Sequence, residues 1–453
     1  MEFKIKIPKE VNKAIRMLQN NKYSAYVVGG AIRDSILNRT VHDWDICTSA
    51  TPLQMIEIFK KYKIIETGLQ HGTITVIIND MPIEITTFRI DGNYSDNRKP
   101  DFVTFTNKLI EDLKRRDFTI NAMAYNNEEG LIDPFDGLYD IEHRILRCVG
   151  VPEKRFSEDA LRILRLWRFS VQLGFYPTEE TEQAARRLLN SLENISMERI
   201  QSEFVKALQG NKFNFVNQRF WYLEAIIPEF IYLFNFKQDN PYHIYDVYIH
   251  SVKAYEYLNN SSDLITRIAT LLHDFGKPFC FQVDENNVKH FNGHCKCGAN
   301  MVDNIMKRLK FDNETRNDVV ELIYYHDTTI MVGKKYIKRW LNKIGEKQFR
   351  RLLELKKADI CAQNPKFVFS RLNDIYKIED LLNSIICSDE CFSLKDLAVN
   401  GNDVKKYMRL KEGKEIGFCL NKMLKLVING EVDNTRDNLI YWMSSISDDW
   451  VCE

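Results

Sequence analysis

The chain has 453 residues, of which 44% are apolar and 12% aromatic, and its 63 basic residues equal its 63 acidic residues. This length exceeds one ordinary core, so we expect several ordered domains. The balanced charge neither favours nor excludes nucleic acid as a partner. The N-terminus, MEFKIKIPKE, lacks an apolar signal segment, and no apolar run of about 18 residues occurs, so we expect a cytoplasmic protein.

The cysteines are scattered along the chain. The closest pair, Cys295 and Cys297, forms C-x-C rather than the two C-x-x-C pairs that zinc sites usually need. We therefore expect reduced, unlinked thiols.

The hydrophobic pattern changes near residue 150. Before it, short β-branched runs alternate with turn signals and amphipathic stretches, which predicts a mixed α/β domain. From Glu153 onward the pattern is almost wholly helical. The predicted fold class is therefore α+β.

A pair of glycines follows the first predicted strand. Residues 25–28 (Ala-Tyr-Val-Val) have the apolar pattern of a buried strand, Gly29 and Gly30 come next, and residues 31–37 have a helical pattern. Glycines at such a turn let backbone N–H groups approach a phosphate, and Arg33 can bind a phosphate oxygen. A tight turn without a ligand is the alternative.

Three acidic residues suit a pair of Mg²⁺ ions. Asp43 and Asp45 flank Trp44, so a strand would put both carboxylates on one face. Two carboxylates side by side repel each other unless a cation lies between them. Glu84, between two isoleucines after a predicted hairpin turn, is the candidate third ligand. Solvent-facing acids on ordinary strands are the alternative.

These segments resemble the class II tRNA nucleotidyltransferases, whose relatives include bacterial poly(A) polymerases. The resemblance runs, in the family's order, through Gly29-Gly30 with Arg33-Asp34, residues 43–52, 115–122, 133–137, 158–162 and 196–200.

The resemblance implies a polymerase-β-like head in which Asp43 and Asp45 bind Mg²⁺ and activate the primer hydroxyl for attack on the α-phosphate. It also assigns Arg116, Asp117 and Asn121 to the nucleotide, in keeping with what guanidinium and carboxylate groups can bind on a triphosphate and a ribose. A charged helix start with capping residues is the alternative for that segment.

A helix predicted to begin near Ser157 carries an apolar stripe, formed by Ala160, Ile163, Leu164, Trp167 and Val171. Alone, its polar side predicts intrahelical ion pairs of Arg162 with Glu158 and Asp159. The family resemblance implies that Asp159 and Arg162 read the donor and acceptor groups that cytosine and adenine share, with Glu158 and Arg165 orienting them.

Residues 90–100 have the composition of a flexible loop. This segment is similar to the full loop of family members that add the final A, which CC-only members look as though they lack. The resemblance therefore favours complete CCA addition, or A addition, over CC addition alone.

Most of the histidines fall between residues 243 and 326. This region looks like an HD-type phosphohydrolase domain, in which His250, His273, Asp274 and Asp359 would hold a divalent metal of unknown identity. His294 and His326 would bind a second metal or the substrate phosphate. A helical body with ordinary histidines is the alternative, and so is a metal site with little activity.

The C-terminal stretch is similar to the family's helical tail, which holds the tRNA elbow, although Glu412 replaces a typical proline. Four domains are therefore predicted: a head (1–150), a helical neck (151–236), an HD-type body (237–386) and a tail (387–453). The predicted function is addition or repair of CCA at the tRNA 3′ end from CTP and ATP. The alternatives are an A-adding enzyme, a poly(A) polymerase, or a metal-dependent phosphohydrolase with an RNA-docking head.

Overall fold

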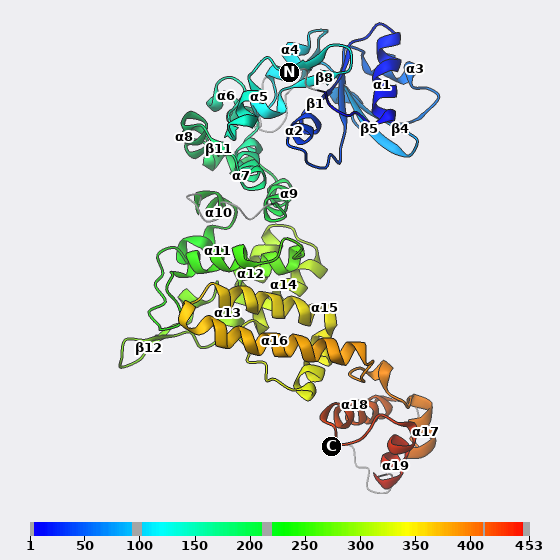
Figure 1. Cartoon of the computed structure of the whole chain (residues 1–453), viewed down its shortest axis with the longest axis vertical. Coiled ribbons are helices and arrows are strands. Elements are labelled where there is room, and N and C mark those ends of the chain that lie inside the picture. The colour runs from blue at the N-terminus through cyan, green and yellow to red at the C-terminus, as the bar shows by residue number, and fades with distance from the viewer. Residues whose placement is uncertain (1–3, 93–101, 211–219, 411–412, 447–453) are drawn as a thin grey trace. The chain divides into compact units, whose positions relative to one another are not determined.

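A computed structural model describes residues 4–92, 102–210, 220–410 and 413–446. It divides into two compact units, Met1–Pro228 and Glu229–Glu453, and each is described by itself (Figure 1). The four predicted domain boundaries stay predictions, since the division found here is into two units. None of the described helices combines the length and apolar character needed to cross a membrane.

The first unit is built on a seven-stranded sheet with the order β3-β4-β5-β2-β1-β8-β9. The strands are β1 (Ala25–Val28), β2 (Asp45–Thr48), β3 (Lys63–Ile65), β4 (Thr73–Ile78), β5 (Met81–Thr87), β8 (Ala124–Asn126) and β9 (Gly130–Ile132). The pair β2 and β5 is parallel, and the other neighbours are antiparallel. A smaller antiparallel pair joins β6 (Arg89–Asp91) to β7 (Val103–Phe105).

The turn between β4 and β5 confirms the predicted hairpin. Asn79 and Asp80 both have positive φ values, of 48° and 61°. Two such residues make a tight turn whose twist matches that of the flanking strands, and Asn and Asp tolerate this conformation. The turn therefore fixes which residues of β5 face the core.

Short helices surround the sheet: α1 (Lys9–Asn20), α2 (Gly30–Ile36), α3 (Pro52–Ile58), α4 (Leu109–Lys114) and α5 (Gly137–Glu142). α1 contacts α3 and the strands β1 and β2, and it covers part of the sheet (Figure 1). The apolar positions of α1, namely Val11, Ala14, Ile15 and Leu18, recur at helical spacing and are buried.

The rest of the first unit is almost wholly helical: α6 (Pro152–Glu158), α7 (Leu161–Leu173), α8 (Glu179–Arg187), α9 (Met197–Leu208) and α10 (Phe220–Ile226). One small parallel pair joins β10 (Ile145–Leu146) to β11 (Tyr176–Pro177). Trp167 of α7 stacks on Phe204 and Tyr222, so aromatic rings bind α7, α9 and α10 together. The predicted apolar stripe of this region is buried throughout.

In the part of the second unit that the structure describes, the helices are accompanied by one hairpin, β12 (Gln282–Val283) and β13 (Lys289–His290). Its helices are α11 (Val247–Tyr257), α12 (Leu264–Leu272), α13 (His294–Arg308), α14 (Asn313–Tyr325), α15 (Lys334–Cys361), α16 (Pro365–Cys387), α17 (Gly401–Met408), α18 (Lys414–Asn429) and α19 (Arg436–Ile446). Aspartates cap α11, α12 and α14 by accepting a backbone hydrogen bond. The predicted α+β fold class is confirmed.

Candidate functional site

Three carboxylates meet where β2 and β5 run side by side. β2 begins at Asp45, and its parallel register with β5 sets Asp45 beside Glu84. The isoleucines on either side of Glu84 are buried, so the alternation of the strand turns Glu84 to the face that carries Asp45. Asp43 precedes β2, so the prediction that both aspartates lie in a strand is wrong for Asp43. The alternation still extends back to it, because Trp44 is buried between the two acids.

Asp45 is the most strongly perturbed of these acids. Burial and the charges of Glu84 and Asp43 raise its pKa to about 6, and Arg116 offsets part of the effect. A divalent cation would remove the repulsion, and a donor set of oxygens alone suits Mg²⁺. The residues present therefore fit a divalent metal.

The turn between β1 and α2 brings two guanidiniums together. Gly29 has a positive φ of 74°, and a side chain there would put a Cβ 3.0 Å from Nη1 of Arg116. Glycine thus allows Arg116 to approach the turn. Gly30 opens α2, and Arg33 on its first turn donates to the amide oxygen of Asn121 at 2.8 Å.

Asp117 is buried at the wall of the same site. Its carboxylate accepts from Nε of Arg165 at 2.7 Å and from Asn121 at 3.1 Å. Burial alone would raise the pKa of Asp117, but Arg165 and Asn121 hold it well below its usual range. Arg165 was predicted to orient Asp159 and Arg162. Its ion pair is instead with Asp117.

The helix predicted from Ser157 is interrupted. α6 ends at Glu158, Asp159 is extended (φ −140°, ψ 103°), and α7 begins two residues later. The predicted Glu158–Arg162 pair is present at 2.8 Å. The predicted Asp159–Arg162 pair is wrong: the extended backbone turns the Asp159 carboxylate away, and it accepts from Arg199 at 3.0 Å.

Arg162 holds this junction together. Its Nη1 donates to the Arg155 carbonyl at 2.9 Å as well as to Glu158, and its Nη2 donates to the Arg115 carbonyl at 3.0 Å. The side chain therefore connects α6 and α7 to the segment that leads into Asp117.

One cavity of about 670 Å³ joins these residues. Of the predicted set, its wall includes Gly29, Gly30, Arg33, Asp43, Asp45, Glu84, Arg116, Asp117, Asn121, Asp159, Arg162 and Arg165. Glu158 is not on this wall: it lines a separate cavity and forms an ion pair with Arg162. Sequence reasoning missed Arg168, Phe169 and Arg199, which also line the cavity. Arg199 lies in the segment 196–200, which carried the family resemblance without a role.

A second group of predicted ligands converges in the second unit. Nε2 of His250 lies 3.0 Å from Asp359 and 3.4 Å from Oδ2 of Asp274, and Nε2 of His273 lies 3.1 Å from the same oxygen. His273 and Asp274 come directly after the last residue of α12. The structure thus brings together the four residues predicted to hold a metal.

The hydrogen bonds of the two histidines leave their Nε2 atoms free for a metal. Nδ1 of His250 donates to the Ala362 carbonyl and Nδ1 of His273 to the Thr270 carbonyl. Both Nε2 atoms are buried without a hydrogen-bond partner among the described residues, whereas Oδ2 of Asp274 also lies 2.7 Å from Nζ of Lys277. Neutral imidazoles and carboxylates form the donor set of a divalent transition metal. This group therefore fits a metal too.

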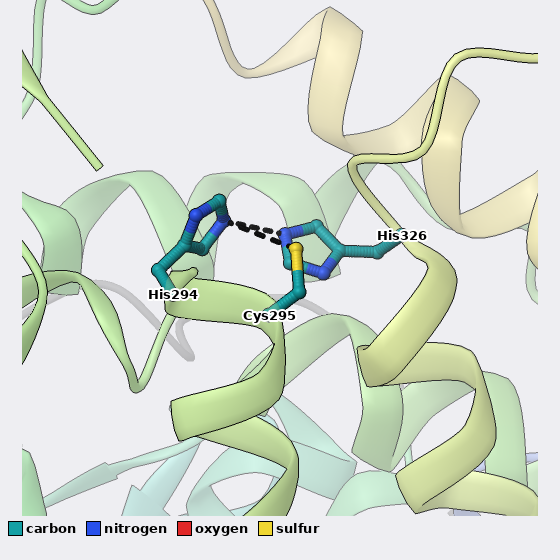
Figure 2. A group of neighbouring side chains, drawn as sticks. All are labelled: His294, Cys295 and His326. Carbon is teal, nitrogen blue, oxygen red and sulfur yellow. Dashed lines mark hydrogen bonds between the residues drawn. The ribbon is translucent and has the colours of Figure 1, made fainter. Parts of the chain in front are cut away.

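His294 and His326 lie next to it, with Cys295 between them (Figure 2). Their Nε2 atoms are 3.1 Å apart, and Oδ1 of Asp274 is 3.7 Å from His294 and 3.5 Å from His326. Burial lowers the pKa of His326, but Asp274 and Cys295 raise it to about 10. A proton therefore supplies the positive charge here when no cation is bound.

A cavity of about 650 Å³ opens onto both groups. Its wall includes the cations Lys277, Lys289 and Arg371 and the aromatic rings of Tyr242, Phe291 and Phe367. Nζ of Lys277 lies 2.7 Å from Asp274. Sequence reasoning assigned no role to these residues.

Comparisons with known proteins support the predicted nucleotidyltransferase head. The Poly A polymerase head domain matches residues 25–147, the probable RNA and SrmB-binding site of polymerase A matches 174–228, and the putative tRNA nucleotidyltransferase domain 2 matches 291–443. The CCA-adding enzyme of Geobacillus sp. is 35% identical over 430 residues, which are 95% of each protein. The chain belongs to the CCA-adding enzyme family.

Other CCA-adding enzymes give the same picture. That of Lactobacillus helveticus is 33% identical over 97% of this chain and 98% of its own length. That of Lactobacillus johnsonii is 52% identical over 198 residues, 48% of its own length. The crystal structure of the Bacillus stearothermophilus CCA-adding enzyme in complex with CTP has a TM-score of 0.64 and 28% identity, covering 97% of this chain and 98% of that one.

The family membership confirms the predicted resemblance to tRNA nucleotidyltransferases. The three proposed metal-binding acids of the first unit, Asp43, Asp45 and Glu84, lie inside the matched head region. By contrast, His250, His273 and Asp274 lie outside the three matched regions. The HD-type assignment of the second unit therefore stays a prediction.

Proposed function

We propose that this CCA-adding enzyme completes or repairs the CCA end of tRNA from CTP and ATP at the cavity of the first unit. The convergence of Asp43, Asp45 and Glu84 with the arginines of one cavity carries the proposal. The CTP complex of the Bacillus stearothermophilus relative supports the choice of nucleotide. The match of residues 291–443 to a tRNA nucleotidyltransferase domain supports the choice of tRNA.

Each part of the nucleotide then has a partner. Asp43, Asp45 and Glu84 hold Mg²⁺, which, when bound, favours ionisation of the primer 3′-hydroxyl and offsets charge on the leaving pyrophosphate. Arg33 and Arg116 bind triphosphate oxygens, because guanidinium groups match phosphate in charge and geometry. No covalent intermediate on a side chain is required.

Asp117 and Asn121 bind the ribose of the nucleotide. Arg165 and Asn121 keep Asp117 ionised, so its carboxylate can accept a hydrogen bond from a ribose hydroxyl. The pair Asp117–Arg165 also connects the sugar site to α7. The residues proposed to bind the sugar and the residues of α7 proposed to bind the base are therefore neighbours.

Asp159 and Arg162 choose the base. The Asp159 carboxylate accepts from the exocyclic amine of cytosine or adenine, in exchange for Arg199, and Arg162 donates to a ring acceptor. Guanine and uracil present the opposite pattern and would leave buried groups unpaired, a loss of about 2–4 kcal/mol. The protein thus takes the place of a template.

The test uses tRNAs that lack one, two or three terminal nucleotides, incubated with labelled CTP and ATP. We expect A, CA and CCA to be added, respectively, and addition to stop there. Addition of A alone would indicate an A-adding enzyme. Long A tails on unrelated RNA would indicate a poly(A) polymerase. The loop that favours complete addition lies largely outside the described residues, since 93–101 are not described.

We infer a second function, metal-dependent phosphate ester hydrolysis, for the second unit. The buried Nε2 atoms of His250 and His273 and the carboxylates of Asp274 and Asp359 support it. A divalent ion held there would activate water, and Lys277 and Arg371 give the adjoining cavity the positive charge that a phosphate needs.

This inference is tested with p-nitrophenyl phosphate and bis-p-nitrophenyl phosphate over a series of divalent cations. Hydrolysis should depend on the cation and be lost in His273→Ala. His143→Ala, an exposed histidine of the first unit, is the control and should hydrolyse at the wild-type rate. Absence of hydrolysis with every cation would contradict the inference and leave nucleotide addition untouched.

A further inference from the structure

The cluster of His294, Cys295 and His326 contains a sulfur ligand. Figure 2 shows the Cys295 thiol beside the two imidazole rings. Its Sγ lies 3.7 Å from Nε2 of His294, and the three ligand atoms lie within 4.8 Å of one another. His294 and Cys295 are the first two residues of α13, and His326 directly follows α14. Two rigid helices therefore hold the cluster.

The hydrogen bonds of the two imidazoles direct both Nε2 atoms toward one point between the rings, where either a proton or a metal cation can lie. Nδ1 of His294 donates to the Phe291 carbonyl, and Nδ1 of His326 donates to the Ile323 carbonyl, each at 2.7 Å. In the neutral rings both Nε2 atoms then carry lone pairs, yet they are 3.1 Å apart. Two buried lone pairs at this distance repel each other unless a positive charge lies between them.

Asp274 completes the set of ligands. Its Oδ1 lies 3.5 Å from Nε2 of His326 and 3.7 Å from that of His294. Its Oδ2 faces His250 and His273 instead. One carboxylate can therefore serve both groups, with one oxygen for each.

The donor types decide which ion fits. Two imidazole nitrogens, one thiolate and one carboxylate oxygen make four ligands, which is the number and type that Zn²⁺ takes. Mg²⁺ prefers oxygen and would leave the sulfur unused. The neighbouring Cys297 does not belong to the set, because its thiol contacts that of Cys280.

We propose that Cys295 is a sulfur ligand of the second metal predicted at His294 and His326, so that these three residues and Oδ1 of Asp274 bind a thiophilic divalent cation, Zn²⁺ first of all, with Asp274 shared with the ion held by His250 and His273. The centre of the second unit is then dinuclear and asymmetric, with sulfur on one side only. The bridging role rests on the proposed first metal of the phosphohydrolase function, whereas the thiolate site stands without it.

The experiment uses the full chain, freed of metal with a chelator and titrated with Co²⁺. A thiolate bound to Co²⁺ gives an intense near-ultraviolet charge-transfer band. We expect this band in the wild type, its loss in Cys295→Ser, and its retention in Cys297→Ser, which removes a thiol two residues away on the same helix. His250→Ala should also keep it, because His250 belongs to the other group.

Zinc content after desalting gives a second readout. Cys295→Ser should hold one zinc equivalent less than the wild type, while Cys297→Ser matches the wild type. No charge-transfer band in the wild type, or unchanged zinc content in Cys295→Ser, would overturn the proposal. Loss of phosphate ester hydrolysis with the band intact would contradict only the phosphohydrolase function.

Discussion

Removing a single head carboxylate tests the proposed magnesium site. We expect Asp45→Asn and Glu84→Gln each to lower nucleotide addition by about 1,000-fold or more, since charge stabilisation of several kcal/mol is lost. Asp80→Asn is the matched control: it removes the same charge from the same hairpin, and Asn tolerates its positive φ. Single-turnover rates with CTP provide the measurement, and more than a few per cent of wild-type activity in either variant contradicts the assignment.

The raised pKa of Asp45 makes metal binding depend on pH. Because burial and Glu84 raise this pKa to about 6, the metal-free fold loses stability as pH rises from the ordinary value of 3.8 through 6 and Asp45 takes on charge. Mg²⁺ restores that stability only when Asp45 is ionised. We therefore expect the rise in Tm caused by Mg²⁺ to be larger at pH 7.5 than at pH 5.

Asp45→Asn provides the control for this experiment. Its Mg²⁺-induced rise in Tm should be small and equal at both pH values, because the amide does not titrate. A rise in the wild type that is equally large at pH 5 and pH 7.5 would show that Asp45 does not govern metal binding.

Single residues were predictable where chemistry restricts the choice. Asp43, Asp45 and Glu84 could be proposed because strand alternation puts acids two residues apart on one face, and the family resemblance implied that Asp43 and Asp45 bind metal. Cys295 could not be proposed as a metal ligand, because C-x-C spacing carries little information. Its partner His326 also follows a different helix. Only the packing of α13 against α14 brings the thiol and that imidazole together.

Among the elements, the break between α6 and α7 holds the residues that we propose choose the base. Arg162→Ala should lower the kcat/KM ratio of CTP to UTP by about 10-fold or more, because the groups that penalise wrong bases are lost. It should also destabilise the fold, as three hydrogen bonds disappear. The measurement uses tRNA that ends before the CCA, at matched folded fraction.

Arg155→Ala separates the two effects. Arg155 also pairs with Glu158 but does not line the cavity, so this variant should lose stability and keep its base choice. An unchanged CTP to UTP ratio in Arg162→Ala would make Arg162 a structural residue of the junction.

Gly276 controls how closely α13 approaches the end of α12. A Cβ at this position would lie 2.1 Å from the His294 carbonyl oxygen and 2.6 Å from the Gly298 nitrogen. Because both obstacles are backbone atoms, Gly276→Ala must push α13 away, at a cost of about 1–3 kcal/mol. We expect a lower free energy of unfolding and a weaker cobalt band. Gly417→Ala, where nothing lies within 4 Å inside α18, is the control and should lose neither.

The interrupted helix shows why element boundaries were harder to predict. The apolar stripe from Ala160 to Val171 fits helical spacing, and all five of its members are buried. The same spacing also suits a chain that bends at Asp159, because the stripe begins only after the bend. The bend depends on Arg162 and Arg199, which reach it from elsewhere in the fold.

At the scale of the whole molecule, the two compact units carry different sites. The double variant His273→Ala/Asp274→Ala should therefore abolish metal-dependent hydrolysis and leave nucleotide addition within about 2-fold of the wild type, since each site draws on its own unit. The change from mixed α/β to almost wholly helical structure could be predicted because hydrophobic spacing changes near residue 150. Equal loss of both activities would show that the units act as one.

The register between β2 and β5 restricts how the length of this protein can vary. A strand that shifts by one residue turns every side chain to the opposite face, so one inserted or deleted residue in β5 would point Glu84 into the core and an isoleucine toward Asp45. Substitutions in the turn at Asn79 and Asp80 keep the site intact, whereas a change in its length does not. Natural variants of this enzyme should therefore differ freely in the sequence of this hairpin and hardly at all in its length.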